Sequence, residues 1–194
     1  LLIPFIKGKV KSAYMLFLPI LVFITLVKMP AGKYWMVQVL DYNLVFGRVD
    51  KLSMVFGYIF TIISFIGVLF ALQVKDDLQH VSAFMYAGGA LGVTFSGDLI
   101  TLYIFWEVMA VFSTFLILAR RTEASGNAAF RYVLVHLFGG LCLLAGIMVY
   151  IQNTGTTEFD YIGLKGTAAW LIFIGIALNA AIPPLHPWLQ DAYP

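Results

Sequence analysis

The sequence predicts an all-α integral membrane protein: a multi-span helical bundle with a broken helix near its C-terminal end and a small surface β-hairpin between the first two full spans. Apolar residues make up 61% of the 194 residues and charged residues only 11%, whereas a soluble domain carries about 25% charged residues. The charges are placed so that long uncharged stretches separate them. Three prolines, Pro183, Pro184 and Pro187, follow the last of these stretches.

Six uncharged stretches have the composition of membrane spans within a single transmembrane domain over residues 1–194. A spanning helix needs about 20 mostly apolar residues. The first stretch contains Pro19, which we expect to kink it, and the third carries Gly88, Gly89 and Gly92, which permit close helix approach. The predicted spans cover about residues 12–27, 52–74, 81–97, 99–119, 132–151 and 167–182.

The only long connection, residues 28–51, has a period of two in its apolar residues. This period is typical of strands whose side chains point alternately to two faces. We therefore expect a small strand pair lying over the membrane surface. The alternating residues are Trp35, Val37 and Val39, then Leu44 and Phe46.

Lysine and arginine are more frequent in the loops on one side of the predicted bundle. Positive charge favours the cytoplasmic side, so residues 7–11 and 120–131 are expected there, in a prokaryotic plasma membrane. The chain begins at Leu1 without a methionine and ends at Pro194. We interpret it as a piece of a longer chain.

The composition argues against several classes of protein. A net charge of +2 gives no basis for a nucleic-acid partner, and the single cysteine, Cys142, excludes a disulfide framework or a cysteine-based metal site within this chain. His80, His136 and His186 lie on different segments without metal-ligand spacing. We expect no cofactor or metal in this chain, and if it belongs to a redox enzyme, the cofactors are on other subunits.

Glu107 is the only charged residue of the predicted span 99–119 and lies near its middle. A charge at the centre of a membrane helix costs roughly 2.5–3.5 kcal/mol, so a chain keeps one where it faces protein or water. Tyr103, Ala110 and Thr114 give the same helix face a small and polar character. Glu107 is therefore a candidate exchangeable acid on an ion path, and the alternative is a structural carboxyl tied to one hydrogen-bond partner.

His136 lies one turn inside the fifth predicted span, four residues after Tyr132. Imidazole titrates near pH 6.5 and could relay a proton. It could equally be an interfacial histidine bonded to a carbonyl group, and both interpretations stay open.

The three prolines cannot continue a helix, because each lacks an N–H and clashes with the preceding turn. Transporters place such interruptions at ion sites. Asn179 supplies an amide one turn before the break, and His186 a titratable group just after it. In the structural alternative, Pro183 ends a helix at the interface and Trp188 anchors it there.

Four runs of residues resemble the antiporter-like subunits shared by respiratory complex I (NADH-quinone oxidoreductase), Mrp-type Na+/H+ antiporters (a D-like subunit) and membrane-bound hydrogenases. They are residues 98–109 (DLITLYIFWEVM), 127–132 (NAAFRY), 184–194 (PLHPWLQDAYP) and 46–53 (FGRVDKLS). The resemblance implies that the six spans are the second to seventh helices of a longer subunit. It also implies that the partners are other membrane subunits of the same complex.

In that family, the glutamate at the position of Glu107 pairs with a lysine on the broken helix, and their coupling gates proton movement. Here Asn179 stands where the family has the lysine, and an amide carries no positive charge. Three interpretations follow: the cation lies on a helix beyond Pro194, His136 replaces it, or this subunit does not pump. We favour the first, because an isolated buried carboxylate is costly.

The leading function is therefore translocation of protons or sodium ions by a subunit of an energy-coupled membrane complex, in contact with the lipid bilayer. The alternative is a non-pumping structural or assembly subunit of the same kind of complex. A membrane enzyme acting on a lipid-like substrate would need a cluster of polar groups at one interface, and this sequence offers only scattered ones.

Overall fold

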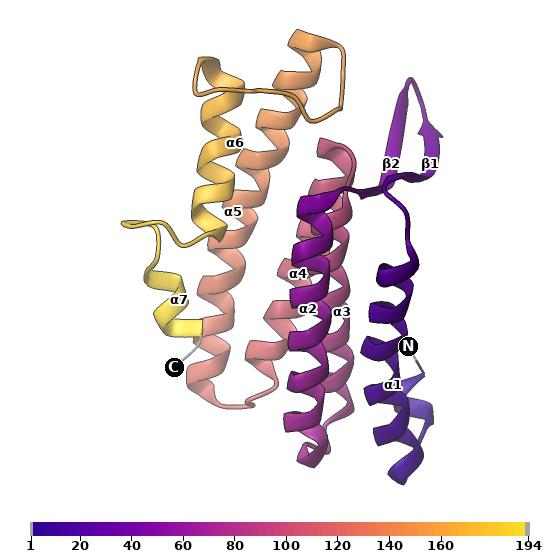
Figure 1. Cartoon of the computed structure of the whole chain (residues 1–194). Helices are drawn as coiled ribbons and strands as arrows, with labels where there is room; N and C mark the ends of the chain where they lie inside the picture. Colours follow the sequence, from indigo (N-terminus) through magenta and orange to yellow (C-terminus); the bar gives the residue numbers. More distant parts are fainter. Residues whose placement is uncertain (1, 193–194) are drawn as a thin grey trace.

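The helices run alternately between two ends of the molecule in the computed structural model, which describes residues 2–192 (Figure 1). The β-hairpin and the α3–α4 and α5–α6 connections lie at one end, called here the hairpin end. The α2–α3 and α4–α5 connections lie at the opposite end. In chain order the elements are η1 (Ile3–Phe5), α1 (Gly8–Lys28), β1 (Gly32–Val39), β2 (Tyr42–Val49), α2 (Lys51–Phe70), η2 (Ala71–Gln73), α3 (Asp77–Phe95), α4 (Leu99–Leu118), α5 (Glu123–Thr154), α6 (Gly166–Asn179) and α7 (Pro187–Ala192).

Four helices within the described residues are long and apolar enough to cross a membrane: α1, α2 with η2, α4 and α5. Helix α6 is apolar but has only 14 residues. The predicted class, a helical membrane bundle with a small hairpin, is confirmed. The count of six spans stays a prediction, because α3 and α6 occupy the sequence of the other two.

Helix α5 is longer than the span predicted over residues 132–151, since it begins at Glu123. Thr122 and Ser125 form a capping box that starts the helix there, with the Ser125 N–H donating to Thr122 Oγ1 at 3.0 Å. Arg131 therefore lies within the helix and not at its boundary. Its exposed guanidinium pairs with Asp191 of α7 at 2.8 Å.

The two strands pair in antiparallel register, with Gly32 opposite Val49 and Val39 opposite Tyr42. The outer strand β1 is mostly exposed, whereas β2 buries Leu44, Val45 and Val49 against the helices. The period of two therefore predicted the strands correctly.

Asp98 fixes the hairpin to the first turn of α4. Its carboxylate is fully buried and accepts the Val45 N–H at 2.6 Å, the Thr101 hydroxyl at 2.6 Å and the Thr101 N–H at 2.9 Å. Two further backbone bonds reinforce this end, from Gly97 N–H to the Val45 carbonyl and from Leu99 N–H to the Thr157 carbonyl. A single carboxylate thus caps α4 and sets the position of the hairpin.

Surface ion pairs join the elements at the opposite end. Lys11 of α1 pairs with Asp77, and Arg121 pairs with Asp76 at 2.9 Å. The Arg121 side chain is exposed, and ion pairs of this kind contribute about 0–1 kcal/mol. The Lys11 side chain is largely buried in its pair with Asp77.

Two of the three glycines that were expected to permit close packing on α3 do so. A methyl group on Gly89 would lie 2.8 Å from Met109 Cγ, and one on Gly92 would overlap the ring of Phe105, so α3 and α4 approach through these positions. Gly88 instead faces open space.

Candidate functional site

Helix α4 places the half-buried Glu107 side chain against α5. A methyl group on Gly140 of α5 would overlap Glu107 Oε1. The carboxylate therefore packs against the backbone of α5 at this glycine, in the space that a larger residue would fill. Tyr103, one turn earlier on α4, hydrogen-bonds the same carboxylate. Thr114 is turned away, because its hydroxyl donates to the Ala110 carbonyl of its own helix at 2.9 Å. Glu107 therefore faces protein.

Helices α5 and α6 pack closely through glycines, and this packing positions Asn179. A methyl group on Gly175 would lie 2.7 Å from the Gly139 carbonyl oxygen, and one on Gly146 would lie 2.7 Å from the Ile172 nitrogen. Asn179, at the end of α6, is consequently held beside the N-terminal half of α5.

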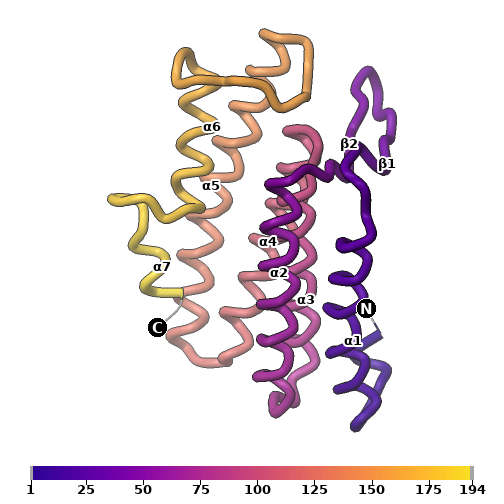
Figure 2. Tube along the Cα trace, viewed as in Figure 1, coloured from indigo at the N-terminus to yellow at the C-terminus, as the bar shows by residue number. Residues whose placement is uncertain are grey.

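The chain interrupts its helix after Asn179. Figure 2 shows the trace leaving the axis of α6 and returning as α7 beside α5. Pro183 and Pro184 lie in this connection, and Pro187 begins α7. The Trp188 indole N–H donates to the Leu178 carbonyl at 2.9 Å, so a side chain of α7 satisfies a carbonyl at the end of α6.

His136 lies within an aromatic cluster made of Tyr132, His136 and Trp188. The Tyr132 ring stacks on the imidazole at 3.7 Å between centroids, and the Trp188 ring meets it edge-on at 4.5 Å. His136 Nδ1 lies 3.0 Å from the Tyr132 carbonyl oxygen, and an Nδ1–H donor there leaves Nε2 unprotonated in the neutral ring. The imidazole is 6% exposed and has the carbonyl partner that the structural interpretation expects, so the relay and the structural interpretation both stay predictions.

A cavity of about 390 Å³ brings two of the predicted residues together. His136 and Asn179 both line it, and Trp106 and Ala110, which flank Glu107, line its α4 wall. The remaining lining residues are Tyr86, Met109, Tyr132, Ala180, Trp188 and Leu189. Glu107 itself contacts α5 at Gly140, which is four residues, about 6 Å along the helix axis, from His136.

His186 does not line this cavity. Its Nδ1 is buried without a hydrogen-bond partner among the described residues. The structure therefore brings His136 and Asn179 together in one cavity, places Glu107 outside its lining against Gly140, and leaves His186 in the connection beyond the break.

Three contributors to the site were not singled out from the sequence: Gly140, Tyr103 as a partner of Glu107, and Trp188 as a partner of His136. The spacing of four residues between Tyr103 and Glu107 was a usable signal, because such residues are neighbours on a helix. Gly140 and Trp188 act across elements, so no local pattern identifies them. Within residues 2–192, no group of three or more His, Cys, Asp or Glu side chains is arranged to hold a metal ion.

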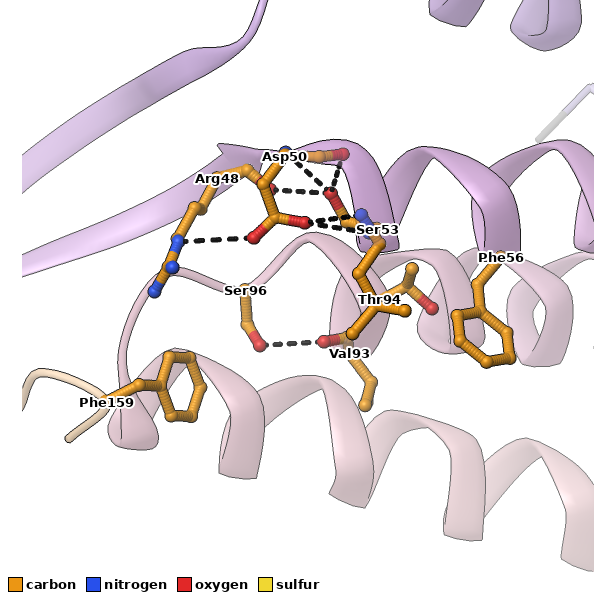
Figure 3. A pocket seen from close by; sticks show the side chains of 9 residues that line it. Arg48, Asp50, Ser53, Phe56, Val93, Thr94, Ser96 and Phe159 are labelled. Carbon is orange, nitrogen blue, oxygen red and sulfur yellow. Dashed lines mark hydrogen bonds and ion pairs between the residues drawn. The ribbon is translucent and has the colours of Figure 1, made fainter. Parts of the chain in front are cut away.

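A second, smaller cavity of about 270 Å³ lies at the hairpin end and contains none of the predicted residues (Figure 3). Asp50 caps α2 beside it, accepting the Ser53 N–H at 2.9 Å and the Leu52 N–H at 3.0 Å, while Ser53 Oγ accepts the Asp50 N–H at 2.8 Å. These bonds from Ser53, together with the nearby Arg48 guanidinium, lower the pKa of Asp50.

Removing this cap with Asp50→Ala is expected to lower the stability of the full-length protein by about 1 kcal/mol at neutral pH. Because the folded-state pKa is lowered, the ionised cap stabilises the fold above the unfolded pKa, and the stabilisation is lost as the pH falls below about 4. Thermal unfolding at several pH values should show the difference between the two proteins becoming smaller in acid, as the charge of the cap is lost. Asp50→Asn, which caps the helix without ionising, should lack this pH dependence. A difference between the wild type and Asp50→Ala that is the same in acid as at neutral pH would contradict the assignment.

Comparison with known proteins identifies the family of this chain. The family model described as NADH:quinone oxidoreductase/Mrp antiporter, transmembrane, matches residues 96–194, about half of the chain, and this segment holds every predicted site residue. The chain belongs to this family.

Three solved structures of membrane complexes share the fold over nearly the whole chain. The archaeal membrane-bound sulfane sulfur reductase complex matches with a TM-score of 0.75 at 20% identity over 99% of this chain and 44% of that one. Respiratory complex I from Thermus thermophilus matches with a TM-score of 0.75 at 20% identity, over 94% and 41%. The Mrp complex from Dietzia sp. DQ12-45-1b gives a TM-score of 0.72 at 21% identity, over 94% and 37%.

In sequence, the Na(+)/H(+) antiporter subunit A1 of Staphylococcus aureus is 28% identical over 204 residues, which cover 92% of this chain and 25% of that protein. The chain thus spans about a quarter of the length of this relative. The names of these similar proteins describe subunits or structures of membrane complexes, and this chain shares the family of the antiporter-like membrane subunits.

Proposed function

We propose that this chain carries part of the ion path of a proton- or sodium-translocating subunit in an energy-coupled membrane complex, with Glu107 as the exchangeable acid. The observation that carries the proposal is the position of the Glu107 carboxylate against Gly140, beside the cavity that His136 and Asn179 line. An intramembrane acid that faces the interior of a bundle is a functional group by default.

The chemistry of the surrounding groups fits the exchange of a cation at this carboxylate. Tyr103 supplies a hydroxyl donor that stabilises the ionised form. His136 can accept and return a proton at Nε2, and Asn179 can orient water or a cation through its amide. The cavity has room for several water molecules, which would connect these groups.

Because residue 179 is asparagine, the chain lacks at this position the lysine that the family resemblance predicts as the partner of Glu107. The Tyr103 hydroxyl donates a hydrogen bond to the Glu107 carboxylate but brings no positive charge to it. We propose that a cation on a helix beyond Pro194 completes the site, since a buried carboxylate without a partner is costly. The sequence that follows Pro194 tests this point: no Lys, Arg or His in the next two helices would contradict it.

The asparagine also favours a second candidate, a non-pumping subunit that has kept the fold for assembly. The two candidates differ in one measurement, ion transport by the intact complex carrying Glu107→Gln. Loss of transport with normal assembly supports translocation, whereas normal transport with weakened subunit association supports the structural role.

Gly140→Ala tests the geometry of the same site. The added methyl group would occupy the position of Glu107 Oε1, so the carboxylate must move, and we expect about fivefold to tenfold slower transport, a barrier increase of about 1–1.4 kcal/mol. Gly126→Ala is the matched control on the same helix, because its methyl group meets nothing within 4 Å. Equal transport by the two variants would show that Glu107 does not depend on this contact.

We further propose that the protein resides in a prokaryotic plasma membrane, with other membrane subunits as partners. The bacterial source of the sodium/proton antiporter relative supports this location. Membrane fractionation of the native host, with detection of the full-length chain, tests it.

A further inference from the structure

The Glu107 carboxylate lies beside the cavity of about 390 Å³ but does not line it. Three other residues of α4 do: Trp106, Met109 and Ala110. Since an α-helix turns about 100° per residue, Ala110 projects about 60° from Glu107, and Trp106 and Met109 lie further round on the same side. A carboxylate is stabilised where it meets polar groups or water. Its position outside a cavity that offers both therefore needs a cause.

The Tyr103 hydroxyl holds the carboxylate in this position. It donates a hydrogen bond to Glu107, and the tyrosine ring packs against the buried cluster that includes Leu143 and Ile147 of α5. Packing in this cluster restricts the ring, so its hydroxyl is a fixed donor. A hydrogen bond from such a donor to an ionised acceptor is among the stronger ones in proteins.

This hydrogen bond draws the carboxylate toward the hairpin end (Figure 1). Tyr103 lies four residues nearer that end of α4 than Glu107 does, and Gly140 lies four residues nearer that end of α5 than His136 does. Four residues correspond to about 6 Å along a helix axis. With the bond in place, the carboxylate is therefore held about one helical turn away from the imidazole that is proposed as its proton relay.

Ala110 leaves a passage from this position into the cavity. It lines the cavity and lies three residues after Glu107, a spacing at which Cβ atoms are about 5–6 Å apart. Because its side chain is only a methyl group, the glutamate side chain can turn past it by changing rotamer. On the other side of Glu107, the neighbour one turn away is Val111, which is exposed and does not line the cavity.

We propose that Tyr103 is a positioning residue that keeps the Glu107 carboxylate outside the cavity until the carboxylate turns past Ala110. Ion exchange with the groups of the cavity follows this release. The proposal rests on the function proposed above for Glu107. It implies that the strength of the Tyr103 bond sets the fraction of the protein whose carboxylate is in the exchanging position.

The rate at which a membrane-soluble carbodiimide labels Glu107, in the full-length protein within its complex, tests the position of the carboxylate. Mass spectrometry gives the rate, which is compared on its acid plateau, where the carboxyl group is protonated in every variant. Tyr103→Phe should raise the plateau rate at least about fivefold, the equivalent of one hydrogen bond. Tyr150→Phe is the matched control, because it removes a hydroxyl from the same buried cluster ten residues along α5 from Gly140, and it should leave the rate unchanged.

Ala110→Leu tests the passage. It should cancel the increase when it is combined with Tyr103→Phe, because the larger side chain blocks the turn of the glutamate into the cavity. Val111→Phe adds comparable bulk one turn from Glu107, on the side away from the cavity, and should not cancel the increase. Equal plateau rates for Tyr103→Phe and the wild type, or an increase that survives Ala110→Leu, overturn the proposal.

Ion transport gives a second measurement, which a purely structural role of Tyr103 would not change in the same way. Tyr103→Phe should lower the half-saturating ion concentration about fivefold, because apparent affinity rises with the fraction of protein in the exchanging position. A packing defect would lower the maximal rate alone, and an unchanged or weaker apparent affinity contradicts the proposal. Normal transport by Glu107→Gln would instead overturn the function of the site, while the labelling rates still report where the carboxylate lies, so the two failures are distinguishable.

Discussion

Replacing Glu107 by glutamine is expected to slow ion transport by the assembled complex at least about tenfold, a barrier increase of about 1.4 kcal/mol or more. Glutamine keeps the size of the side chain and its ability to accept a hydrogen bond from Tyr103, but it neither ionises nor releases a proton. The fold should tolerate the change, since the neutral amide removes a charge that is costly within the membrane. Ion flux into vesicles, measured alongside subunit recovery after purification, separates the two effects.

Two control variants make the result specific to this carboxylate. Glu107→Asp keeps an ionisable group but withdraws it from Gly140, so it should retain more transport than Glu107→Gln. Glu158→Gln removes an exposed carboxylate at the hairpin end that pairs with Lys33, and it should leave transport unchanged. Full transport by Glu107→Gln would remove the proposed mechanism.

The largest effect on stability is expected for Trp188→Ala, at about 3–5 kcal/mol. The indole is 9% exposed, meets His136 and Tyr132 edge-on, and bonds the Leu178 carbonyl. Alanine would leave a void beside His136 and an unsatisfied carbonyl at the end of α6. Thermal unfolding of the solubilised complex should show a marked loss of stability, and proteolysis should increase in the connection between α6 and α7.

Trp170→Ala is the matched control, because Trp170 lies on α6 with half of its surface exposed, and its ring meets that of Phe173 on the same helix. It should destabilise the protein much less. Trp188→Phe keeps a ring but loses the indole N–H, so it should cost about 1 kcal/mol for the missing hydrogen bond. Equal losses for Trp188→Ala and Trp170→Ala would contradict the role given to α7.

The sequence predicted the membrane class, the hairpin and the interruption before Pro187 because each leaves a local signature. Charges are scarce within spans, side chains alternate along strands, and proline cannot donate a backbone hydrogen bond. The start of α5 was missed because Arg131 looked like a boundary. The capping box at Thr122 and Ser125 begins the helix nine residues before the predicted span, and the guanidinium reaches the surface from within it.

The candidate site was only partly predictable. Glu107 could be found because a lone charge within an apolar span is costly wherever it lies. Its contact with Gly140 could not, since it joins residues 33 positions apart and depends on how α4 crosses α5. The role of Trp188 could not be predicted for the same reason, because its partners His136 and Leu178 come from two other helices. Contacts between elements are fixed by tertiary packing, for which one sequence provides no direct signal.

The buried carboxylate of Asp98 has a mechanical consequence. Its hydrogen bonds join β2 to the start of α4. The adjoining bond from the Leu99 N–H to the Thr157 carbonyl joins the start of α4 to the α5–α6 connection. These bonds hold the three segments in a fixed relation to one another. A helix rearrangement that accompanied the proposed ion transport would therefore leave β2, the start of α4 and the α5–α6 connection in their present relation.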